Sequence, residues 1–104
     1  MPLAYPDWII SEIPTHITSI SPAVVTEDSG PVTLTLRGSE FVTSSTVQFD
    51  GKYLLKTELV SPTELRATVP AELVHKVGTY SVRVVHRAPG YGQTNAEFLI
   101  VKFR

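Results

Sequence analysis

The sequence predicts an all-β protein that folds as a sandwich of two sheets. From Ile17 onward, short runs rich in β-branched residues alternate with Gly, Pro, Ser and Asp, a pattern typical of many short strands joined by turns. Helical periodicity is nearly absent. A chain of 104 residues is long enough for one hydrophobic core and short for two. We therefore expect a single sandwich.

The first clear strand is the segment VTLTLR, which lies between Gly30 and Gly38. Its two-residue period places Val32, Leu34 and Leu36 on one face and the polar residues on the other. A phosphate-binding loop would instead need glycines gathered before a helix, usually with a lysine. The two glycines here bracket a strand, so we exclude a phosphate site.

The segment TVQFDG predicts a second strand, with Val47 and Phe49 facing inward. The dipeptide Asp50-Gly51 suits a tight hairpin turn. The segment KYLLK that follows is expected to return as the next strand.

In the segment ELRATVP, the residues expected to face inward are Leu65, Ala67 and Val69. Pro70 ends this strand because proline has no amide proton for the ladder. The following segment AELVHKVG is the one plausible helical turn.

The segment TYSVRVVHR places Tyr80, Val82 and Val84 on one face. In total we predict about seven strands, with turns about every 8–12 residues, which indicates an immunoglobulin-like β-sandwich. The antibody form is excluded because the chain has no cysteine and its only tryptophan, Trp8, precedes the first strand.

The last segment, AEFLIVKF, is apolar on both faces. Phe98 and Ile100 compete for the core with Leu99, Val101 and Phe103, and the pattern does not decide between the two sets. One set is expected to be partly exposed.

Composition excludes several classes of function. The net charge is −1 and the basic residues are scattered, so nucleic acid and anionic membrane are not expected as partners. The absence of cysteine excludes thiol catalysis, thiolate metal sites and disulfides. The start MPLAYPDWII has neither the basic region nor the apolar core of a signal peptide.

Six runs in order resemble the IPT/TIG domain: ITSISP, GPVTLTLRGSEF, STVQFDG, SPTELRATVP, GTYSVRVV and NAEFLIV. They cover residues 17–103. The resemblance implies a non-catalytic immunoglobulin-like module, of the kind found in plexins, in transcription factors and in bacterial and phage surface proteins, with no catalytic residue and no cofactor. One departure is Glu40, where the family often has Asn. Because Asn tolerates left-handed backbone better than Glu, we expect this turn to have a different backbone structure from the family's usual one.

No residue pattern indicates catalysis or a metal. The spacing of His16, His75 and His86 matches no short metal-ligand motif, and no G-x-S-x-G motif occurs. The acidic pair at residues 27–28 and Asp50 could hold calcium through oxygen ligands. We favour turn chemistry for them, since Asp bends loops. We predict that the protein is not an enzyme.

We predict that residues 1–16 form an extended leader and residues 17–104 the domain. The leader carries a tentative set of partner-binding residues, Tyr5, Trp8, Ile9 and Ile10. If the leader covers the edge of its own sheet, its role is stability, whereas if it reaches another chain it is an assembly arm with aromatic anchors.

The loop HRAPGYGQTN is a second candidate contact. Tyr91 lies between two glycines, with Arg87, Gln93 and Asn95 as hydrogen-bonding neighbours, a mixture suited to protein or sugar contact. Its alternative is an ordinary hairpin loop. The last two tentative binding residues are Phe98 and Ile100, which would contact a partner if their side of the last strand is the exposed one.

Because the chain starts with Met and shows one domain, we expect a complete small protein that decorates a larger particle, most simply a phage virion. The expected partner is a capsid, tail or other surface protein, and a second copy of the chain or a glycan are further candidates. The alternative is a spacer or carbohydrate- or protein-binding module of a bacterial cell-surface or glycan-degrading protein, located extracellularly. A DNA-associated dimerisation module is disfavoured because no basic stripe occurs.

Overall fold

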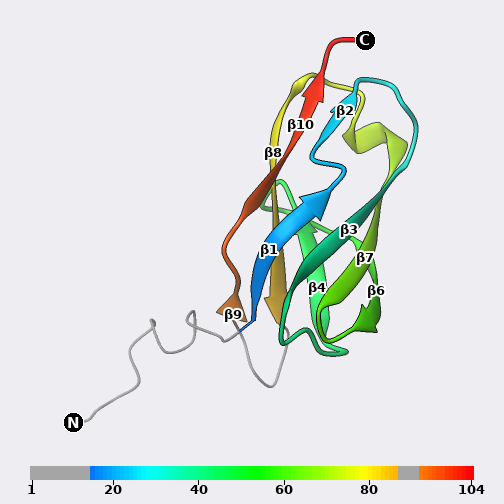
Figure 1. Cartoon of the computed structure of the whole chain (residues 1–104). Coiled ribbons are helices and arrows are strands. Elements are labelled where there is room, and N and C mark those ends of the chain that lie inside the picture. The colour runs from blue at the N-terminus through cyan, green and yellow to red at the C-terminus, as the bar shows by residue number, and fades with distance from the viewer. Residues whose placement is uncertain (1–14, 87–91) are drawn as a thin grey trace, which may run out of the picture.

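A computed structural model describes residues 15–86 and 92–104, which form two packed sheets (Figure 1). The first sheet has four strands, in the order β1 (His16–Ser21), β3 (Val32–Ser39), β7 (Glu64–Val69) and β6 (Lys56–Ser61). The second has six: β2 (Val24–Thr26), β10 (Glu97–Lys102), β8 (Gly78–His86), β4 (Ser45–Phe49) and β5 (Tyr53–Leu54), with β9 (Gly92–Gln93) paired to β8.

The strand order is that of an immunoglobulin-like sandwich. The β1-β3-β7-β6 sheet corresponds to strands A, B, E and D, and β10-β8-β4 to G, F and C. The chain changes sheet between β1 and β2, at the cis peptide bond Ser21-Pro22, and again between β5 and β6, at the buried Leu55. The predicted fold class is therefore confirmed. Seven strands have five or more residues. The short β5 lies within the predicted strand KYLLK, whereas β2, β6 and β9 were not predicted.

The core lies between the sheets and follows the predicted alternation. The inward residues predicted in β3, β4 and β7 are all buried, as are Val82 and Val84 of β8. Tyr80 is partly buried and packs against this cluster. The predicted helical turn is the 3-10 helix η1 (Ala71–Leu73), which begins directly after Pro70 ends β7.

The structure decides which face of the last strand is buried. Leu99 and Val101 of β10 are fully buried, whereas Phe98 is 54% exposed and Ile100 is 44% exposed. Phe103 lies beyond the strand end and is also exposed. Thus β10 completes the core with one face and presents a second apolar face outward.

The first strand departs from simple alternation. The register of β1 against β3 shifts at Thr18, a β-bulge that lets both Ile17 and Ile20 face the core although they are three residues apart. Opposite the bulge, a Cβ at Gly38 would collide with the His16 carbonyl oxygen. Glycine at this position therefore permits the close approach of the two strands.

Three acidic residues occupy left-handed backbone in the turns. Asp28, Glu40 and Asp50 have φ values of 56°, 60° and 57°. Asp50 is followed by Gly51 with φ 74°, so the β4–β5 hairpin has the two positive φ angles that a type I′ turn requires. Asp28 and Asp50 thus have the backbone conformation that turn chemistry calls for. Glu40 adopts the conformation that Asn would adopt more readily.

We expect the substitution Leu34→Asp to unfold the domain, because it places an unpaired carboxylate at a fully buried position. Thr33 is next to Leu34 on the same strand but faces solvent, so the substitution Thr33→Asp should leave the protein folded. Circular dichroism melting of both variants checks this. A cooperative melt of Leu34→Asp near that of the parent would contradict the assigned inward face.

We expect Glu40→Asn to raise the free energy of unfolding by about 0.5–1 kcal/mol, because Asn relieves the cost of left-handed backbone at an exposed position. Glu40→Ala removes the same carboxylate but keeps that cost, so it should give no gain. Urea unfolding of the two variants measures the difference. Equal stabilities would show that backbone conformation at residue 40 is not limiting.

Candidate functional site

The two outer faces of the sandwich differ in chemistry. On the four-stranded sheet, the outer face carries Glu64 between Arg37 and Arg66, with N···O distances of 3.4 and 3.3 Å. Beside these ion pairs is an open hollow of about 390 Å³, lined by threonines and charged residues of β3, β6 and β7. This face is polar and solvated, and its exposed ion pairs contribute little stability.

The outer face of the six-stranded sheet carries an apolar patch along β10. It is formed by Val24, Phe98 and Ile100, here called the β10 strip. Val24 pairs with Ile100 across the parallel β2–β10 ladder and Phe98 is two residues further along β10, so the three side chains share one face. All three are at least 44% exposed.

The β10 strip does not serve the core. Leu99 and Val101 already fill the space between the sheets from β10, and Val25, next to Val24, packs against the same core. Adjacent exposed apolar residues on a sheet expose surface that water solvates poorly, and they often mark a contact site. The β10 strip is therefore the candidate binding surface of the described residues.

The structure places some of the predicted binding residues and not others. Phe98 and Ile100 are brought together in the β10 strip, and Gln93 is exposed on β9, opposite Val85. The remaining predicted residues lie outside the described ranges, namely Tyr5, Trp8, Ile9, Ile10, Arg87 and Tyr91. These stay predictions.

Asn95, predicted as a hydrogen-bonding residue of the contact loop, makes two hydrogen bonds within the domain. Its Oδ1 accepts a hydrogen bond from the Ile17 amide and its Nδ2 donates one to the Ile17 carbonyl, both at 2.9 Å. The side chain thus acts like one residue of a neighbouring strand and joins β1 to the segment that leads into β10. No local pattern in the sequence indicates this pair, because the two residues are 78 positions apart.

This pair fixes where the chain enters the domain. Thr15 is buried and β1 begins at His16. The Thr15 hydroxyl donates to the Glu40 carbonyl at 2.9 Å. Whatever precedes Thr15 therefore joins the domain beside the start of β10.

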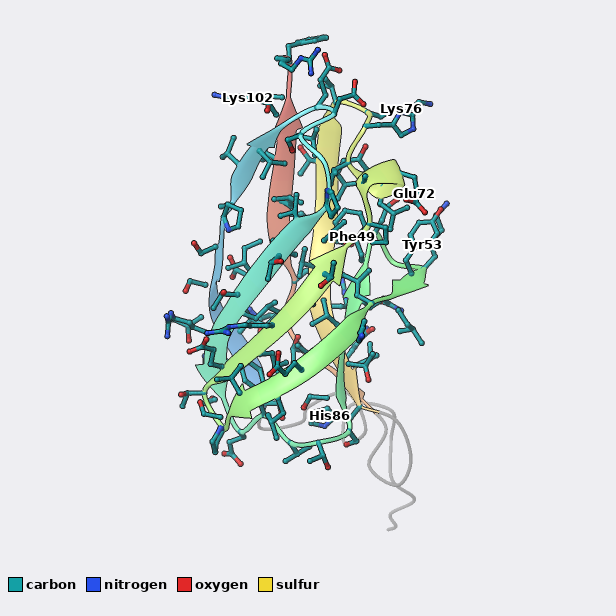
Figure 2. All side chains as sticks on the ribbon, turned by 90° about the vertical axis from the view of Figure 1, so that its right-hand side faces the viewer. Phe49, Tyr53, Glu72, Lys76, His86 and Lys102 are labelled. Atoms are coloured by element: carbon teal, nitrogen blue, oxygen red, sulfur yellow. The ribbon has the colours of Figure 1, made fainter. Side chains whose placement is uncertain are left out.

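A small polar network lies at the same end of the molecule (Figure 2). His86 Nε2 is 2.9 Å from Ser45 Oγ and 3.4 Å from Thr15 Oγ1. Ser45 Oγ accepts from the Val42 amide. The tautomer of His86 sets which atom of the Ser45–His86 pair donates. Desolvation by burial lowers the pKa of His86 from its ordinary value of 6.5, which favours the neutral imidazole.

The Ser45–His86 pair has the residue types of a nucleophile and its base, but its serine is enclosed. Ser45 is only 4% exposed. Within the described ranges, no carboxylate hydrogen-bonds to His86, so a triad is not assembled there. The same ranges hold no group of three His, Cys, Asp or Glu residues suited to a metal ion. They also contain no helix with the length and apolarity needed to cross a bilayer.

The comparison with known families assigns this architecture. The profile of the IPT/TIG domain matches residues 14–100. The chain belongs to the IPT/TIG family. A search of curated proteins gave no significant match.

The family fits what the structure shows. IPT/TIG domains are generally non-catalytic immunoglobulin-like modules for binding or structure. The match covers β1 to β10, so both the β10 strip and the Asn95–Ile17 pair belong to this module.

We expect the stability of this IPT/TIG domain to fall as the pH drops from 7.5 to 5.5. The folded-state pKa of His86 is below its ordinary value, so below about 6.5 the unfolded chain binds a proton that the folded chain resists. The contribution of His86 to the free energy of unfolding is therefore fully present above the pKa of His86 in the unfolded chain. It decreases as the pH falls towards the pKa of His86 in the folded chain. Urea unfolding at the two pH values measures this loss.

His86→Gln should reduce that pH dependence, and His75→Gln, at an exposed histidine, should not. An unchanged pH dependence in His86→Gln would show that another group is responsible.

Proposed function

We propose that this IPT/TIG domain docks the β10 strip onto another protein and so takes part in a surface assembly. The supporting observation is that Phe98 and Ile100 lie side by side on a sheet face while the core is complete without them. Aromatic side chains such as Phe98 are enriched in protein interfaces, whose buried centre is more apolar than the rest of the surface.

The position of the chain entry supports the same surface. The Asn95–Ile17 pair holds the entry beside the start of β10, the strand that carries Phe98 and Ile100. The apolar leader residues Trp8, Ile9 and Ile10 are accordingly a second set of candidate contacts.

The assembly that we propose is the surface of a phage particle, with the domain as a virion accessory or decoration protein. The support for this finer proposal is the resemblance to a family that includes phage and bacterial surface proteins, together with the outward-facing β10 strip. The alternative is a spacer or binding module on a bacterial cell surface. Immunoblotting of density-gradient fractions from the source culture separates the two, since the domain would be found with particles or with cell envelopes.

We expect the double variant Phe98→Ser, Ile100→Thr to lose co-sedimentation with the purified particles, because it removes the apolar anchors. The variant should stay folded, with a free energy of unfolding within about 1 kcal/mol of the parent, since both side chains are exposed. The matched control Thr33→Ser, Thr68→Ser changes the polar sheet face and should bind as the parent does. Equal sedimentation of the double variant and the parent would contradict docking through the β10 strip.

A further inference from the structure

A hollow lies at the other end of the sandwich from His86, between the β4–β5 hairpin and the 3-10 helix η1. Its volume is about 130 Å³, and Phe49, Tyr53, Tyr80, Glu72 and Lys76 are among the residues that line it. Figure 2 shows Phe49, Tyr53 and Glu72 close together in this part of the molecule, with Lys76 nearer the end of the sandwich. Pockets for drug-sized ligands are larger, roughly 300–1,000 Å³, so this hollow suits one small ring.

The floor of the hollow is aromatic and held in place. The Phe49 and Tyr80 rings stack with their centroids 5.3 Å apart and an angle of 21° between their planes. The Tyr80 hydroxyl donates to the Lys76 carbonyl at 2.8 Å, which ties the segment after η1 to β8. The Asp50 amide donates to the Ser81 carbonyl at 2.8 Å, which ties the hairpin to the same strand. The hollow is thus preformed between anchored segments.

One wall is an exposed aromatic ring. Tyr53 is 40% exposed and lines the hollow. The Lys52 ammonium lies 5.4 Å from the centroid of the Tyr53 ring, yet Lys52 does not line the hollow. The lysine therefore steadies the ring from outside while ring surface stays available to a ligand.

The rim carries hydrogen-bonding groups of both charges. Asp50 and Glu72 supply carboxylates, Lys76 supplies an ammonium group, and His75 also lines the hollow. Among the described residues, no side chain hydrogen-bonds to the Asp50, Glu72 or Lys76 side chain. A rim with groups of both charges favours a neutral ligand over an anion or a cation.

We propose that this hollow binds a single neutral sugar ring, such as the terminal pyranose of a glycan. The apolar face of a pyranose presents C–H bonds that suit the negative face of the Tyr53 ring. Its hydroxyls can donate to the Asp50 and Glu72 carboxylates and accept from Lys76, at groups that have no other protein partner among the described residues. A wholly apolar ligand would desolvate these charged groups without compensation. The site is separate from the β10 strip and does not depend on it.

The test is a titration of the ¹⁵N-labelled full chain with the methyl glycosides of glucose, galactose, mannose and N-acetylglucosamine, followed by NMR. We expect at least one glycoside to shift the amides of residues 50–53 and 72–76, with saturation at millimolar concentration, as is usual for a small ligand in an open site. Absence of shifts in both segments with all four glycosides would overturn the proposal.

Variants tie the shifts to the hollow. Tyr53→Ala should weaken binding at least tenfold, and Glu72→Gln should weaken it several-fold without changing the shape of the site. The matched control is Leu54→Ala, which removes an exposed side chain of the same hairpin that does not line the hollow. The NMR spectrum of each variant reports its fold. Shifts that persist unchanged in both Tyr53→Ala and Glu72→Gln would also overturn the proposal.

Discussion

Burial of alternate side chains along each long strand is the constraint on which the rest of this structure depends. Because successive residues of a strand point to opposite faces, filling the space between two sheets fixes which half of each strand remains outside. In most strands the outer half is polar. In β10 it is not, since Leu99 and Val101 occupy the core and Phe98 and Ile100 are left on the surface. The candidate binding surface is thus a consequence of the core.

The sequence alone predicted the buried face of a strand wherever apolar and polar residues alternated regularly. Residues 32–37, 47–49 and 65–69 showed their inward faces, and the dipeptide Asp50-Gly51 showed its turn. The sequence did not predict the buried face of β10, because apolar residues occupy both faces of that strand. The face that is buried depends on how β10 packs against β8 and β2. At β1 a bulge resets the alternation, and a bulge depends on the partner strand more than on local sequence.

The candidate sites were less predictable than the fold, because they combine distant segments. Phe98 and Ile100 were identified as one of two possible exposed sets, but their neighbour Val24 comes from a three-residue strand that the pattern did not show. The Asn95–Ile17 and His86–Ser45 pairs join residues 78 and 41 positions apart. The aromatic hollow draws on a hairpin, η1 and β8, and no pattern in the sequence indicated it.

The arrangement as a whole suits a module that joins surfaces. One sheet face is polar, the other carries the β10 strip, and Asn95 holds the chain entry beside the start of β10. The proposed sugar site is lined by the β4–β5 hairpin, η1 and β8. In Figure 1, η1 lies towards the end of the sandwich away from the entry. The two proposed sites therefore occupy different parts of the domain.

The most direct measurement is hydroxyl-radical footprinting of the four phenylalanines, in the free full chain and in the chain bound to its particle. The buried Phe41 and Phe49 and the exposed Phe103 provide internal references, with 2%, 1% and 75% exposure. We expect Phe98 to be oxidised in the free chain and protected on the particle, while Phe41 and Phe49 are protected in both. If Phe98 were as protected as Phe49 in the free chain, or as reactive on the particle as in solution, the β10 strip would not be the docking surface.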